Sequence, residues 1–394
     1  MKWTSWVASE TYIEDSIDVS AKHIAVHIPP EKVDLLIVYV TPHYSEQMEV
    51  VPVRLREHFP RAHILGCSAA GVIGNGHEVE GEAAISVTAA SLPNVRLTPS
   101  YIEGHRLPSD DVGPEAWHEL IGVDPDGSPS FLIMGDPYSS QPERLLTGLD
   151  YAYPDSVKLG GLASGAGQMR ENVLFLDNTV YYQGCISMAM TGNIEIDSIV
   201  AQGCKPVGDI MTVTAVEDNM IFEIDEEAPL EILRRMQGGL SRRDEELFRK
   251  SLFIGVEKDV FTENPGYGDF LIRNIIGVDT ESGALAIGAE LEAGQLVQFH
   301  LRDQYTSAED LNTMLSEYVA HADSSHAEGA MLFTCQGRGV GLYGERDHDS
   351  NLFMEKTGIP VSGFFCEGEI GPLGDTTYIH GYTSSFGIFR EKSS

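Results

Sequence analysis

The chain is short of basic residues, and this shortage excludes two classes of partner. Of its 394 residues, 26 are lysine or arginine and 60 are aspartate or glutamate, which gives a formal net charge of −34. A surface this acidic repels phosphate backbones and anionic lipids, so we expect neither nucleic acid nor a membrane surface as a partner. We interpret the charge as an adaptation for solubility rather than as a sign of a basic partner.

Cysteines and long apolar runs are also scarce. The five cysteines are scattered and never spaced as C-x-x-C: Cys67, Cys185, Cys204, Cys335 and Cys366. This pattern predicts a reduced, cytoplasmic protein without a zinc site, and we expect no other metal and no cofactor. No apolar run approaches the ~20 residues of a membrane helix. The first residues also lack the apolar core of a secretion signal.

The sequence does contain one structural unit that is repeated three times. Each copy has a short apolar run, a polar spacer, a second apolar run ending in a glycine turn, and a strand-like return. The opening runs lie at 35–40, 131–136 and 331–336, the glycine turns at 65–71, 159–165 and 362–368, and the returns at 82–90, 185–192 and 382–389. Such repeats predict an α/β protein with mixed sheets, in two similar halves built from β-α-β-β units with helices packed on the sheets.

The spacing of the copies predicts two domains, 1–215 and 216–394. The copies cover about 33–91 and 129–192 in the first domain and about 329–389 in the second, which holds a possible degraded copy at 251–291. A helix over 306–322 has the clearest apolar face of any segment.

At its glycine-rich joints the sequence resembles the FIST family. The residues that carry the resemblance lie at 66–71, 159–165, 202–208, 333–339 and 363–389. The resemblance covers both the N-terminal and the C-terminal FIST domains, and no segment looks like an F-box. It implies a stand-alone sensory protein that binds a small ligand, with amino acids suggested, or an adaptor, and it leaves the output open. Our leading hypothesis is that the protein couples the ligand to a protein partner in signal transduction.

The charged residues of the third copy form the candidate ligand site. Arg338 and Glu369 follow two neighbouring parallel strands, and His380 begins the return, so we expect all three at one crevice. An arginine suits the carboxylate of an amino acid, and an acid suits its ammonium group. Further candidate contacts adjoin these residues: Cys335, Gly337, Gly339, Cys366, Glu367 and Tyr382.

Several alternatives remain open. Arg338 and Glu369 also suit a salt bridge between two turns, and Ser68 and Ser164 suit either a pocket wall or tight packing of glycine turns. Cys335 and His380, oriented by Glu369, would suit a cysteine-dependent amidase.

A glycine-rich surface also suits an adaptor that recruits proteins. The pattern G-x-G-x-x-G at 339–344 is a weak nucleotide signal. The charged run at 345–349 is expected to be a solvated helix entry rather than a metal site.

Overall fold

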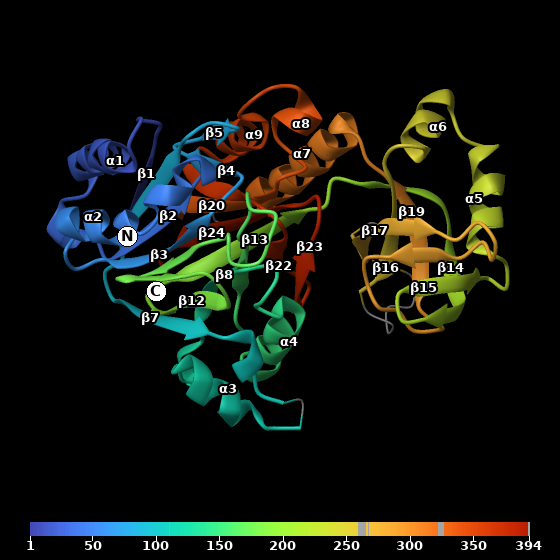
Figure 1. Cartoon of the computed structure of the whole chain (residues 1–394), viewed down its shortest axis with the longest axis horizontal. Helices are drawn as coiled ribbons and strands as arrows, with labels where there is room; N and C mark the ends of the chain where they lie inside the picture. The colour runs from blue at the N-terminus through green and yellow to red at the C-terminus, as the bar shows by residue number, and fades with distance from the viewer. Residues whose placement is uncertain (110, 259–264, 267, 322–326, 393–394) are drawn as a thin grey trace. The chain divides into compact units, whose positions relative to one another are not determined.

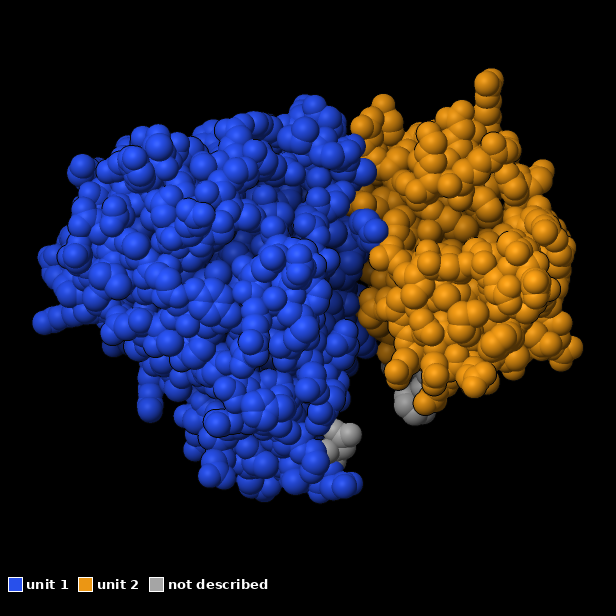
Figure 2. Space-filling view, in the orientation of Figure 1, with its two compact units in different colours: residues 1–201, 312–394 blue, residues 202–311 orange. Residues whose placement is uncertain are grey.

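The chain forms two compact units. The computed structural model describes residues 1–109, 111–258, 265–266, 268–321 and 327–392. Unit 1 holds Met1–Ala201 and Asn312–Ser394, and unit 2 holds Gln202–Leu311 (Figure 2). None of the helices in the described part of the chain combines the length and the apolarity needed to cross a membrane.

Three copies of one α/β arrangement build unit 1 (Figure 1). Each copy has an edge strand, a helix, a central strand, a second helix, another central strand, a hairpin and a return strand. The first copy contains β1 (Lys2–Ala8), α1 (Ile13–His27), β2 (Leu35–Val40), α2 (Val50–His58), β3 (His63–Ser68), β4 (Gly71–Gly74), β5 (His77–Glu80) and β6 (Ile85–Ser91). The second contains β7 (Val95–Ile102), α3 (Pro114–Ile121), β8 (Ser130–Gly135), α4 (Pro142–Ala152), β9 (Lys158–Leu162), β10 (Leu174–Leu176), β11 (Thr179–Tyr181) and β12 (Cys185–Gly192).

The third copy is interrupted by unit 2. It contains β13 (Glu195–Ala201), α7 (Gln304–His321), β20 (Ala327–Cys335), α8 (Val340–Tyr343), α9 (His348–Thr357), β21 (Val361–Cys366), β22 (Glu369–Leu373), β23 (Thr376–His380) and β24 (Ser384–Arg390). Unit 2 is a closed barrel with two helices, formed by β14 (Lys205–Glu217), β15 (Met220–Ile224), α5 (Pro229–Gln237), α6 (Arg242–Phe248), β16 (Leu252–Glu257), β17 (Phe270–Val278), β18 (Leu285–Ile287) and β19 (Leu296–Leu301).

The three copies exchange their hairpins. In each copy the two central strands are parallel, and the return strand lies antiparallel beside the first of them. The hairpin then joins the sheet of another copy: β4 pairs with β21, β10 with β3, and β22 with β9. The sheets therefore share one order, which is β1-β6-β2-β3-β10-β11, β7-β12-β8-β9-β22-β23 and β13-β24-β20-β21-β4-β5. This cyclic exchange locks the copies together.

Alternation along the central strands places the core. On β2, Leu35, Ile37 and Tyr39 share one buried cluster with the inner faces of the other two sheets. The residues between them pack instead against the apolar faces of α1 and α2, so both faces of the sheet are covered. The predicted α/β class, with mixed sheets, repeated units and helices on the sheets, is confirmed.

Each copy is longer than the sequence predicted, because an edge strand and a helix precede the first apolar run. The signal for α1 is present in the sequence as apolar residues spaced three to four apart, and all of them are buried: Ile13, Ile17, Ala21, Ile24 and Ile28.

Residues 251–291 are not a degraded copy. β16 and β17 are antiparallel members of the barrel, whereas the copies require parallel central strands. The expected domain boundary between 215 and 216 falls inside β14, and the compact units instead divide after Ala201 and after Leu311.

One glycine in each copy has no room for a side chain. These glycines lie in the second central strand, and each faces the same position of the first strand across the parallel pair. An added Cβ would lie 1.8–1.9 Å from a carbonyl oxygen of that strand at Gly66, Gly160 and Gly363. The aligned glycines therefore mark a close approach of two backbones.

Candidate functional site

The guanidinium of Arg338 is buried and held by protein groups. Its Nε and Nη2 contact the two carboxylate oxygens of Asp349 at 2.7 and 3.2 Å. Nη1 donates to the carbonyl of Tyr382 at 3.2 Å, and Nη2 donates to the hydroxyl of Tyr343 at 2.5 Å. Burial alone would raise the pKa of Asp349, but the charge of Arg338 holds that pKa well below its usual range. Arg338 thus forms a bidentate interior ion pair.

Glu369 and His380 are the other two predicted site residues, and both are buried and contact backbone groups. Glu369 is fully buried, and its Oε2 accepts a hydrogen bond from the backbone N–H of Thr383 at 3.1 Å. His380 is 3% exposed, and its Nε2 lies 2.9 Å from the carbonyl oxygen of Gly371. The segment 382–384 therefore gathers Arg338, Glu369 and Asp349, since it contacts all three.

The sequence predicts that these groups line an open crevice, but in the structure all three are buried. Arg338 and Glu369 have no exposed surface, and the backbone of the turn at Tyr382 contacts the guanidinium of Arg338. The carboxylate that pairs with Arg338 at 2.7 Å belongs to Asp349. The run at 345–349 is solvated only in part: Glu345 and Arg346 are exposed, whereas Asp349 is 2% exposed.

The two cysteines of the third copy are interior residues. Cys335 and Cys366 occupy paired positions on β20 and β21, and they are 7% and 0% exposed. Burial raises the pKa of Cys366 well above its usual range. The sulfur of Cys335 accepts the N–H of Gly337 at 3.4 Å. Buried thiols in such surroundings are poor nucleophiles, so burial does not favour the amidase alternative.

The remaining predicted residues have structural contacts. Glu367 is exposed and accepts a hydrogen bond from Gln336, and Gly339 precedes α8 with a φ of +62°. Ser164 donates to the carbonyl of Phe365 and accepts the N–H of Ala70.

Ser68 is likewise engaged with its neighbours. Its hydroxyl donates to Asn172 and accepts the N–H of Val173 at 3.1 Å, and its carbonyl accepts the N–H of Ser164 at 3.2 Å. The two serines therefore tie the glycine turns of the three copies together, as the packing alternative predicted.

The hairpin β4–β5 of the first copy forms hydrogen bonds with the segment 340–350, which follows Arg338. Glu78, on β5, accepts the N–H of Ser350 at 3.0 Å, and its own N–H donates to Asp347 at 2.5 Å. Glu80 accepts the N–H of Val340 at 2.9 Å. The sequence gives no local sign of these contacts, because they follow from the hairpin exchange.

Glu78 should make stability depend on pH near neutrality. Burial first, and then the charge of Asp349, raises the pKa of Glu78 to about 7. The folded protein therefore keeps a proton that the unfolded chain releases above its ordinary pKa, so stability falls as the pH rises through about 7. Between pH 5 and pH 8, the free energy of unfolding should fall by roughly 2–3 kcal/mol less in a Glu78→Gln variant than in the native protein.

Urea unfolding at both pH values measures this difference. Glu14 on α1 is exposed, so Glu14→Gln serves as the matched control and should keep the native pH dependence. Parallel stability curves for Glu78→Gln and the native protein would contradict the assignment.

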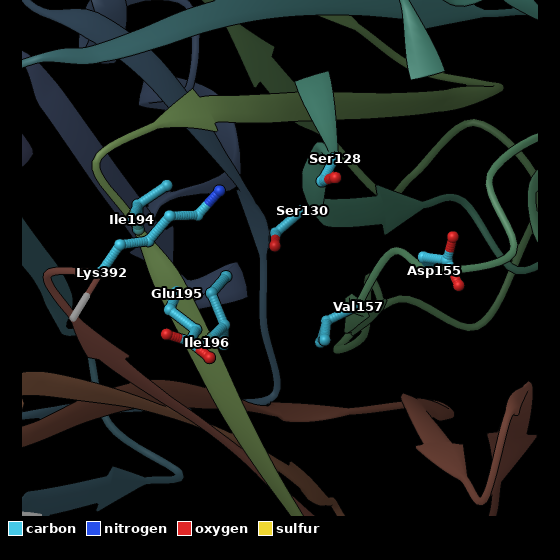
Figure 3. A pocket seen from close by; sticks show the side chains of 8 residues that line it. All are labelled: Ser128, Ser130, Asp155, Val157, Ile194, Glu195, Ile196 and Lys392. Atoms are coloured by element: carbon cyan, nitrogen blue, oxygen red, sulfur yellow. The ribbon is translucent and has the colours of Figure 1, made fainter. Parts of the chain in front are cut away.

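A cavity of about 390 Å³ lies elsewhere in unit 1, at the amino ends of β8 and β9 (Figure 3). We call it the amino-end cavity. Figure 3 shows residues 194–196 and Lys392 on one side and Ser128, Val157 and Asp155 on the other. Its full lining is Ser128, Ser130, Asp155, Val157, Ile194, Glu195, Ile196 and Lys392.

Side chains of both charges line this cavity. Lys392 follows β24, Glu195 begins β13, and Asp155 precedes β9. Glu195 pairs with Arg390 at 2.8 Å. The ammonium group that lines the cavity is that of Lys392. Lys158, at the start of β9, forms an ion pair with Asp150 at 2.8 Å instead.

The sequence interpretation missed this site because its residues are dispersed from 128 to 392. The segment 124–130 looks like a turn-rich linker, and it supplies both serines. No group of three or more His, Cys, Asp or Glu side chains within the described residues could hold a metal ion.

The chain is similar in sequence to uncharacterised mycobacterial proteins. An uncharacterised protein of Mycobacterium tuberculosis (strain H37Rv) is 34% identical over 329 residues, which cover 83% of this chain and 84% of that protein. An uncharacterised protein of Mycobacterium bovis is 31% identical over 348 residues, which cover 88% of each. Among solved structures, the cyanuric acid hydrolase from A. caulinodans aligns over 100% of this chain and 99% of its own, with a TM-score of 0.33 and 8% identity. That likeness is too low to carry an argument.

Family models cover most of the sequence. A model described as the FIST N domain matches residues 34–227, and one described as the FIST C domain matches residues 229–372. The two models meet close to the boundary expected from the repeats, although the contacts divide the chain differently. FIST domains are recognised as sensory domains. The extent of these two matches shows that the chain belongs to the FIST family.

Proposed function

We propose that this FIST protein senses a small zwitterionic molecule, an amino acid, in the amino-end cavity. The observation that carries the proposal is the lining of that cavity, where an ammonium and two carboxylates accompany hydroxyl and aliphatic groups. Its volume of about 390 Å³ lies within the range of small-molecule sites.

The charges of the cavity match the two ends of an amino acid. Lys392 would bind the ligand carboxylate, and Asp155 would bind its ammonium group, with Glu195 beside it. Neither Lys392 nor Asp155 forms a direct ion pair with a residue in the described ranges, although the charge of Asp155 acts on the buried ammonium of Lys158, where it opposes the lowering of the pKa by burial.

The remaining walls favour an aliphatic ligand. Val157, Ile194 and Ile196 supply apolar surface, and Ser128 and Ser130 supply hydroxyl groups. We therefore expect leucine, isoleucine or valine to bind more tightly than aspartate or glutamate, because the protein is already strongly acidic.

Thermal unfolding with each of the twenty amino acids tests the proposal. A ligand at 100 times its Kd should stabilise the folded protein by about 2.7 kcal/mol. Lys392→Met and Asp155→Asn should each weaken binding about tenfold or more, because each removes one charge-assisted hydrogen bond. Lys22→Met on α1 is the matched control, since Lys22 is exposed and far from the cavity in sequence.

Stabilisation by none of the amino acids would refute the proposed ligand class. Stabilisation that persists unchanged in Lys392→Met would refute the site. Protein that copurifies without any small-molecule response would favour the adaptor alternative. A cytoplasmic location, with a signalling protein as the partner, belongs to the same proposal.

A further inference from the structure

Two segments join the barrel of unit 2 to unit 1, and hydrogen bonds tie these segments to each other. One is β13, which leads into Gln202, and the other is α7. Within unit 2, Gly203 accepts the hydroxyl of Ser307 at 3.0 Å and donates its N–H to Asp310 at 2.7 Å. Within unit 1, Tyr318 on α7 donates its hydroxyl to Asp197 on β13 at 3.0 Å.

Arg390 connects this junction to the amino-end cavity. Its Nη1 lies 2.8 Å from the carboxylate of Glu195, which lines the cavity. Its Nε lies 3.1 Å from Oδ2 of Asp197, the same oxygen that accepts the hydroxyl of Tyr318. The side chains of Arg390 and Asp197 are 16% and 24% exposed, so solvent screens their contact only in part, whereas Glu195 is 45% exposed and its contact with Arg390 is screened more strongly.

We infer that the network of Glu195, Arg390, Asp197 and Tyr318 couples the amino-end cavity to both connections of the barrel. The identity of the ligand rests on the proposed function, whereas the coupling is a property of the protein alone. Arg390 is a positioning residue in this network, because it divides its guanidinium between the cavity wall and the junction.

The shared oxygen sets the direction of the coupling. The proposed function places the ammonium group of the ligand at Asp155 with Glu195 beside it, and this group would compete with Arg390 for the carboxylate of Glu195. Arg390 would then turn its charge toward Asp197, and Oδ2 of Asp197 would accept the hydroxyl of Tyr318 less strongly. Occupancy of the cavity should therefore loosen the attachment of α7 to β13.

A Glu195→Gln variant tests the coupling without any ligand. It keeps the size of the side chain and removes the charge that draws Arg390 toward the cavity. We expect hydrogen exchange of the amides at 312–321 to become about threefold faster or more than in the native protein. In a Tyr318→Phe background, Glu195→Gln should add no further increase, because the hydrogen bond it acts on is already absent. Glu14→Gln, on exposed surface of α1, is the matched control.

Unchanged or slower exchange in Glu195→Gln would overturn the inference, and so would an equal increase in both backgrounds. Circular dichroism of each variant first establishes that it is folded. Since no amino acid is added, failure of this experiment is distinct from failure of the ligand screen, which measures stabilisation of the native protein.

Discussion

Replacement of Asp349 by asparagine is expected to lower the free energy of unfolding by about 3–5 kcal/mol. Asparagine keeps the size of the side chain but removes the charge that faces the buried guanidinium of Arg338. Loss of one member of a buried ion pair is costly, because the other charge stays in the interior without its counterion. The hydroxyl of Ser384, which donates to the same carboxylate at 2.7 Å, would lose a charged acceptor as well. Urea unfolding at pH 7 measures the change.

Two further variants separate the ion pair from a general effect on α9. Glu355 is exposed on the same helix, so Glu355→Gln should leave the free energy of unfolding unchanged within about 0.5 kcal/mol. The double variant Arg338→Met with Asp349→Leu should be less destabilised than Asp349→Asn, since it removes both charges. A loss below about 1 kcal/mol in Asp349→Asn would contradict the interior ion pair.

Alanine at Gly160 should be among the most damaging small substitutions at the described glycines. A Cβ there would lie 1.8 Å from the carbonyl oxygen of Ile133 on the neighbouring strand. The φ of Gly160 is +152°, a conformation that residues with a side chain rarely adopt. Because the clash involves backbone rather than a flexible side chain, we expect a loss of about 3 kcal/mol or more, or failure to fold.

The repeat offers an internal test of this explanation. Gly363 lies against the carbonyl of Leu332 in the same way, so Gly363→Ala should be comparably damaging. Gly167 has nothing within 4 Å of its added Cβ, so Gly167→Ala is the matched control and should be close to neutral. Soluble yield and urea unfolding measure all three variants. A folded Gly160→Ala protein with native stability would show that the strands can separate at this point.

The sequence predicted the local elements better than their pairing. The aligned glycine turns correctly indicated a repeated unit, and the helix expected at 306–322 is α7, Gln304–His321. The exchange of hairpins between copies left no local signal, because a hairpin carries the same pattern of residues whichever sheet it joins. The antiparallel strands of the barrel resembled a copy because short apolar runs do not record strand direction.

The candidate site was predictable only in part. Sequence reasoning brought Arg338, Glu369 and His380 to one region, and the segment 382–384 does gather the first two. It did not identify Asp349 as the counterion, since a charged residue at a helix start is usually solvated. The amino-end cavity depends on distant segments of the second and third copies, so no spacing in the sequence indicates it.

The proposed sensory role is tested most directly by a crystal structure of the protein soaked with the most stabilising amino acid. We predict density for one ligand in the amino-end cavity, with its carboxylate at Lys392 and its ammonium group at Asp155. An empty amino-end cavity, with the amino acid bound at Arg338 in place of Asp349, would contradict the proposal and restore the site expected from the sequence.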